Sequence, residues 1–105
     1  MSRIFAVLLS FVCPISNVAA QNLISNGDFE VLRACPENVS GLASQGLHVS
    51  SPTTGTADVF SKCATGKVAI PDNFRGSQTA FSGDTYAGLY LFSPNNYRDY
   101  LKLTL

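Results

Sequence analysis

Short apolar stretches separated by turn residues follow one another along the chain after residue 20. The clearest stretch covers residues 85–92, where apolar side chains occupy both faces of an extended chain, as in a strand inside a sandwich. In residues 97–105, Leu101, Leu103 and Leu105 alternate with polar residues, which predicts a half-buried strand. Shorter extended or apolar stretches are predicted at residues 22–24, 29–32, 46–50 and 67–70.

Turn signals separate these stretches. The Asn-Gly pair at residues 26–27 accepts positive φ and predicts a turn or bulge, and residues 71–73 and 93–96 predict two further turns. Residues 34–66 are rich in Ser, Thr, Gly and Pro and have little periodicity, so we expect long loops there. Because no stretch after residue 20 has a helical apolar repeat with caps, the pattern predicts an all-β fold.

The first twenty residues have the pattern of a secretory signal peptide. Arg3 supplies a positive charge, residues 4–12 form an almost unbroken apolar run, and small residues end the segment at Ala20. The run is shorter than the ~20 residues that a membrane span needs. We predict cleavage after Ala20, which leaves residues 21–105 as a mature domain without a transmembrane segment. The alternative is a lipoprotein with the lipid on Cys13, but the residue before it is a valine where a small residue is expected.

The mature chain has little net charge and two cysteines. Without Arg3, six basic and seven acidic residues remain, and they form no basic patch, so we do not expect nucleic acid or an anionic membrane surface as a partner. Cys35 and Cys63 are an even pair in an exported chain, which predicts a disulfide; two free buried thiols are the alternative. His48 is the only imidazole, and no C-x-x-C occurs, so we do not expect a zinc site.

Five segments form an ordered set between the signal peptide and the end of the chain. They are NLISNGDFE at 22–30, PTTGTADVF at 52–60, VAIPDNFRG at 68–76, SGDTYAGLY at 82–90 and NYRDY at 96–100. The first resembles the opening strand of galactose-binding-like jelly rolls, which include many carbohydrate-binding modules. The ordered set is similar to N-terminal domains of exported bacterial proteins that often continue into OmpA-like or gliding-motility-type modules.

This resemblance implies a jelly-roll β-sandwich and a non-catalytic binding or adhesion module. The module would be secreted or associated with the bacterial cell surface or outer membrane, and it would bind a polysaccharide or glycoconjugate. The alternative is a structural protein–protein interaction domain of a larger cell-envelope protein, with no ligand of its own. The chain departs from the family in having no Trp, which removes one candidate ring for the core or for sugar stacking.

Family members also continue for several strands past the position of Leu105. We therefore expect a sandwich that is truncated at its C-terminus, with the apolar face of residues 101–105 lacking partner strands. Such an edge invites aggregation or pairing with another chain. On this interpretation the chain alone is poorly soluble or oligomeric, and restoring the downstream strands yields a monomer.

The resemblance also implies a structural calcium ion. In related jelly rolls the Glu of the Phe-Glu pair, here Glu30, helps bind calcium, and a Ser-Gly loop before a later strand supplies carbonyl oxygens. That loop is Ser82-Gly83-Asp84 in this chain. Calcium takes six to eight oxygen ligands, so carboxylates and carbonyls are apt donors. The alternative is that Glu30 is an ordinary carboxylate at the end of a strand.

Aromatic residues beside polar turns are the candidates for sugar binding. Tyr97 and Tyr100 flank Arg98 and Asp99 after an Asn-Asn turn. The first candidate sugar-binding group is therefore Tyr97, Arg98 and Tyr100. Phe74 and Arg75 form a second candidate sugar-binding group. We expect Tyr86 and Tyr90 to belong to the core.

Catalysis is not expected. The single His lies in a Ser/Gly-rich segment without a nucleophile elbow, which is poor evidence for a triad. No pair of carboxylates has the pattern of a glycoside hydrolase cleft.

Export predicts a defined N-terminus. Mass spectrometry of the secreted protein should find Gln21 as the first residue, because the small residues before it suit signal peptidase. Retention of Met1, or a lipid on Cys13, would contradict this prediction.

Overall fold

The computed structural model describes residues 20–105 of the chain. The predicted signal peptide lies outside this range except for Ala20. Among the described residues, no helix combines the length and the apolar character that crossing a membrane requires.

The described chain is mostly extended, with little helix. Its helical elements are one turn of α-helix, α1 (Leu42–Gln45), and one 3-10 turn, η1 (Gly66–Val68). Six short strands pair in three antiparallel couples: β1 with β6, β2 with β5, and β3 with β4. The strands are β1 (Val49–Ser50), β2 (Asp58–Ser61), β3 (Asp72–Asn73), β4 (Gly76–Ser77), β5 (Thr85–Gly88) and β6 (Lys102–Leu103).

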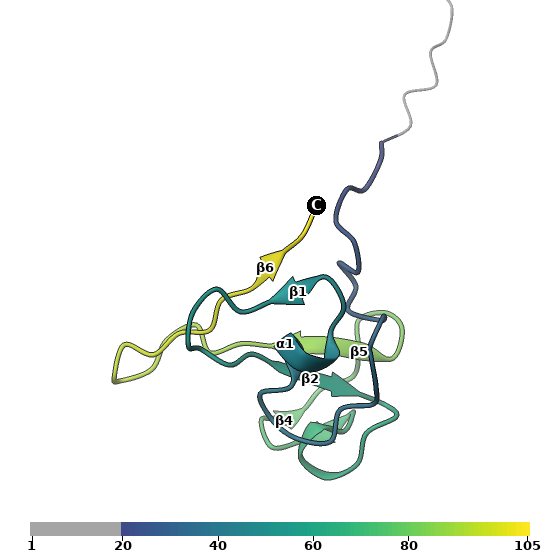
Figure 1. The fold of residues 1–105 in the computed structure, drawn as a ribbon. Coiled ribbons are helices and arrows are strands. Elements are labelled where there is room, and N and C mark those ends of the chain that lie inside the picture. Colours follow the sequence, from purple (N-terminus) through teal and green to yellow (C-terminus); the bar gives the residue numbers. More distant parts are fainter. Residues whose placement is uncertain (1–19) are drawn as a thin grey trace, which may run out of the picture.

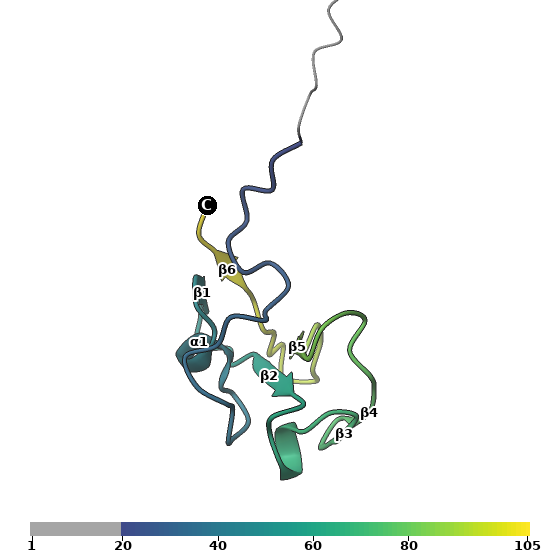
Figure 2. The same cartoon turned by 90° about the vertical axis from the view of Figure 1, so that its right-hand side faces the viewer.

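The β2–β5 couple lies between the other two (Figures 1 and 2). The β1–β6 couple and the C-terminus are at one end, and the β3–β4 hairpin is at the opposite end. Within the middle couple, Asp58 lies opposite Gly88 and Phe60 lies opposite Tyr86. Residues of β2 and β5, far apart in sequence, thus lie side by side.

Strand β2 separates two hydrophobic clusters, and all four of its residues are buried. Because successive side chains of a strand point to opposite faces, Val59 enters one cluster and Phe60 the other. Val59 packs with Leu42 and Val49, whereas Phe60 packs with Val68 and Tyr86. Strand β2 therefore has hydrophobic packing on both of its faces.

Strand β2 is the main element that the sequence pattern did not predict. It lies inside residues 34–66, which we expected to be loops. Burial on both faces removes the alternation that identifies a strand, and Asp58 places a charged residue at its start.

Several predicted strands are wrong in extent or type. Residues 22–24 form no strand; they are exposed, and the Asn22 side chain accepts the N–H of Ile24. The turn predicted at residues 71–73 is also wrong, since Asp72 and Asn73 form β3, and the apolar run at residues 67–70 lies partly in η1. In residues 97–105 only β6 is a strand.

The strand predicted for residues 85–92 ends at Gly88. Beyond that point the backbone N–H of Tyr90 donates to the Asp99 carboxylate, and the Tyr90 carbonyl accepts the N–H of Asp99. These two bonds replace a continued ladder. The expectation that Tyr90 lies in the core is wrong, since its side chain is exposed, and Tyr86 is only partly buried.

Two local predictions are confirmed. Residues 25–28 form a turn in which Asn26 has φ 55°, and its side chain bonds the backbone of Val31 and the carbonyl of Leu47. Cys35 and Cys63 form a disulfide with a Cα–Cα distance of 6.0 Å. Turn and disulfide together fasten the N-terminal third of the domain.

The disulfide should contribute much of the stability of so small a domain. Replacing Cys35 and Cys63 together by Ser should lower the free energy of unfolding by about 3–4 kcal/mol, because the open chain regains the entropy of a loop of roughly 29 residues. Denaturant unfolding of both chains measures this difference. Equal stability of the two chains would contradict the prediction.

Candidate functional site

The β3–β4 hairpin presents Phe74 and Arg75 in its two-residue turn. Asn73 lies opposite Gly76 in the strand pairing, and its side-chain oxygen accepts the backbone N–H of Arg75 at 2.9 Å. The Asn73 amide also donates to the hydroxyl of Tyr86 at 2.9 Å, and this hydroxyl donates to the carbonyl of Gln78. The hairpin is therefore tied to β5 through polar contacts.

A pocket of about 260 Å³ lies between the hairpin and the β2–β5 couple. Phe60, Tyr86 and Leu89 provide aromatic and aliphatic surface in it, while polar residues of the hairpin region complete its lining. Gly88 lets the Phe60 ring lie close to the backbone of β5, since a Cβ at this position would be 2.6 Å from that ring. The polar lining residues are Asn73, Arg75, Ser77 and Gln78.

Arg75 is paired with a buried carboxylate behind the pocket. Its guanidinium donates to Asp58 Oδ2 at 2.7 Å, and Asp58 is only 2% exposed. The other Asp58 oxygen accepts the backbone N–H of Ser40 at 2.6 Å. With partners on both oxygens, the carboxylate is compensated in the way that burial of a charge requires.

The Arg75 guanidinium packs against two aromatic rings, and each of these rings contacts a further one. The centre of its guanidinium lies 3.5 Å from the Tyr90 ring centroid and 4.7 Å from that of Phe74. Phe74 stacks on Phe60 at 5.9 Å, and Tyr90 meets the edge of Tyr97 at 6.2 Å. Cation–π and aromatic contacts of this kind fix the position of the guanidinium.

The structure brings together some residues of the two candidate sugar-binding groups. Phe74, Arg75 and Tyr97 are connected through Tyr90, which sequence reasoning had assigned to the core. Arg98 is exposed and does not line this pocket, and Tyr100 borders a separate small crevice beside Leu42 and Leu101. The pattern did not reveal Asp58, Phe60, Asn73, Gln78 and Tyr86 as site residues.

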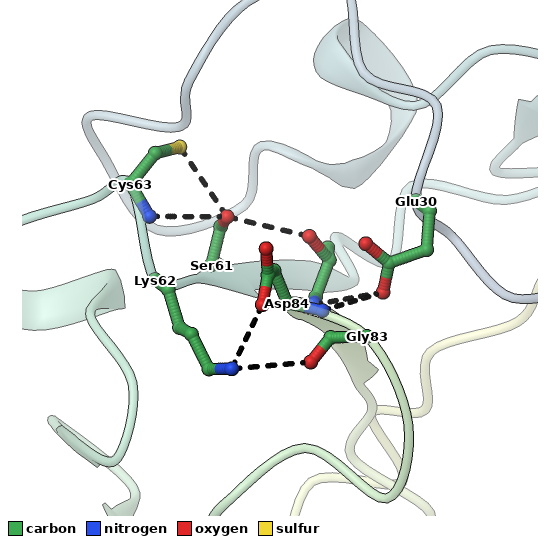
Figure 3. Close-up of polar contacts among 7 residues, drawn as sticks. Glu30, Ser61, Lys62, Cys63, Gly83 and Asp84 are labelled. Carbon is green, nitrogen blue, oxygen red and sulfur yellow. Dashed lines mark hydrogen bonds and ion pairs between the residues drawn. The ribbon is translucent and has the colours of Figure 1, made fainter.

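Glu30 reaches the loop that the sequence paired with it (Figure 3). Its Oε1 accepts the backbone N–H groups of Asp84 and Thr85 at 2.9 and 3.0 Å. Gly83, at φ 64°, lies directly against the carboxylate, and a Cβ there would overlap it. Glu30 thus fastens the N-terminal segment to the start of β5.

Lys62 supplies a positive charge to the other side of this loop. Its Nζ donates to Asp84 Oδ1 at 2.8 Å and to the Gly83 carbonyl at 3.4 Å. Two of the oxygens expected to bind calcium are therefore bonded to an ammonium group. In residues 20–105, no three or more Asp, Glu, His or Cys side chains gather as metal ligands. A calcium ion at this loop would therefore have to displace the Lys62 ammonium group.

Comparisons with known proteins return no match to this chain among family models, curated proteins or solved structures.

Removing the Glu30 carboxylate should destabilise the domain. Glu30→Ala leaves two backbone N–H groups without their acceptor, so the free energy of unfolding should fall by about 1–3 kcal/mol. Glu37→Ala, at an exposed position, is the control and should have little effect. Thermal unfolding measures both variants.

The same melting curves test calcium. Since Lys62 already provides the cation, we expect equal melting temperatures in calcium and in chelator for the wild type and for Glu30→Ala. A wild-type melting temperature that falls in chelator, with no such fall in Glu30→Ala, would show that calcium binds the folded state.

Proposed function

We propose that this chain is an exported, non-catalytic binding module whose pocket beside Arg75 takes a sugar unit of a polysaccharide or glycoconjugate. The observation that carries the proposal is the composition of that pocket. Phe60, Tyr86 and Leu89 offer apolar surface, and Asn73 and Gln78 offer polar groups beside it. A pyranose ring needs both, because it has apolar C–H faces and hydroxyls around its edge.

The size of the pocket favours a single sugar ring. Pockets for drug-sized ligands usually measure ~300–1,000 Å³, and this one, at about 260 Å³, lies just below that range. A neighbouring sugar would then lie outside the pocket. Phe74, Tyr90 and Tyr97 are all exposed aromatic residues near Arg75 and are suited to contact it.

We place the module in a jelly-roll sandwich of the galactose-binding type. The motif set at residues 22–100 supports this assignment, and the three antiparallel couples are compatible with a small β-rich fold. The Cys35–Cys63 disulfide supports an oxidising compartment, which is the location of secreted and cell-surface proteins. A bacterial cell surface is the location that the resemblance implies.

One observation favours the second candidate function, a structural domain that binds another cell-envelope protein. Leu91 and Phe92, the third and fourth residues after the end of β5, are 79% and 72% exposed. Neighbouring exposed apolar side chains often belong to protein interfaces. If this function holds, the protein binds its partner through this segment and binds no soluble glycan.

Blocking the pocket tests the first proposal. The secreted protein is screened against soluble glycans, and the strongest binder is titrated against the wild type, Ser77→Trp and Ser50→Trp. Ser77 lines the pocket from β4, whereas Ser50 is exposed on β1 at the other end of the molecule. Ser77→Trp should weaken binding at least about tenfold, a loss of ~1.4 kcal/mol.

Ser50→Trp is the matched control and should bind like the wild type. Absence of glycan binding by the folded wild type, or equal binding by Ser77→Trp, would contradict the proposed site.

A further inference from the structure

We propose that Asp58 determines the charge selectivity of this pocket, so that it accepts uncharged sugars and rejects anionic ones such as uronates. The inference rests on the proposed function and adds the class of sugar. It follows from the way in which the charge of Arg75 is already compensated.

Asp58 cannot easily release Arg75 to a ligand. Its carboxylate is 2% exposed, with Oδ2 on the Arg75 guanidinium and Oδ1 on the backbone N–H of Ser40. A buried carboxylate that lost its cation would be left as an uncompensated charge, which is strongly unfavourable. The pair therefore persists when a ligand enters the pocket.

The guanidinium is equally constrained. The rings of Phe74 and Tyr90 lie against it at centroid distances of 4.7 and 3.5 Å, and 26% of the Arg75 side chain is exposed. What remains for a ligand is the set of N–H groups not used by Asp58. Such donors can bond a hydroxyl oxygen without any change in the ion pair.

An anionic ligand would find no net positive charge in the pocket. Among the described residues that line the pocket, Arg75 is the only one with a charged side chain, and Asp58 offsets its charge. A ligand carboxylate would approach Arg75 at short range from Asp58, and like charges at such a distance repel. A neutral sugar brings hydroxyls and avoids this repulsion.

The test uses matched sugar pairs. Methyl glycosides of glucose, galactose and mannose are compared with the uronic acids of the same rings by NMR titration of the secreted protein, at low and at physiological salt. For each ring that binds, we expect the neutral member to bind at least about tenfold more tightly. The affinity of the neutral member should not change with salt, because no net charge is neutralised.

Asp58→Asn tests the source of the selectivity. The amide oxygen can still accept a hydrogen bond, but Arg75 loses its counter-charge. The ratio of neutral to uronate affinity should therefore fall at least about tenfold. Glu37→Gln is the control: it removes one acidic group at an exposed position outside the pocket and should leave the ratio unchanged.

The outcomes distinguish the two proposals. Tighter, salt-sensitive binding of uronates by the wild type would overturn the inference and leave carbohydrate binding standing. A folded Asp58→Asn variant with an unchanged ratio would do the same. Absence of binding by every neutral and anionic sugar would overturn the proposed function itself. If Asp58→Asn does not fold, the wild-type ratio and its salt dependence decide the question.

Discussion

The carboxylate of Asp58 holds together parts of the chain that no regular sheet connects. One oxygen accepts the N–H of Ser40, in the loop before α1, and the other accepts the guanidinium of Arg75, in the turn of the β3–β4 hairpin. Removing one partner of such a buried pair costs about 3–5 kcal/mol, because the remaining charge stays buried. The position of the hairpin, and with it one side of the pocket, therefore depends on a residue of β2.

Two other carboxylates also connect distant segments of this fold by accepting backbone N–H groups. Glu30 accepts the N–H groups of Asp84 and Thr85, and Asp99 accepts the N–H of Tyr90. Backbone N–H groups away from water need an acceptor, and strands of two to four residues leave many without one. Side-chain carboxylates supply these acceptors where the ladder ends. This explains how a domain with three separate strand couples fixes its long connections.

Sequence reasoning succeeded where structure is decided locally and failed where it depends on distant contacts. The turn at Asn26 follows from the tolerance of Asn for positive φ. The disulfide joins distant segments, but the even cysteine count after residue 20 was enough to predict it. The extent of β5 does not follow from its own residues. The strand ends at Gly88, and beyond it the N–H of Tyr90 donates to the side chain of Asp99, which lies farther along the chain. Strand β2 was missed because burial of both faces leaves no alternation.

The site follows the same division. Phe74, Arg75 and Tyr97 could be selected from sequence because they are aromatic or charged residues beside polar turns. Asp58 and Tyr86 could not, since only folding places Asp58 behind Arg75 and joins Tyr86 to the hairpin. A side chain on a turn is held in one position only when packing and hydrogen bonds restrict its rotamers. Here a buried ion pair and two aromatic rings provide that restriction, so the short hairpin can present Arg75 in one orientation without the support of a large sheet.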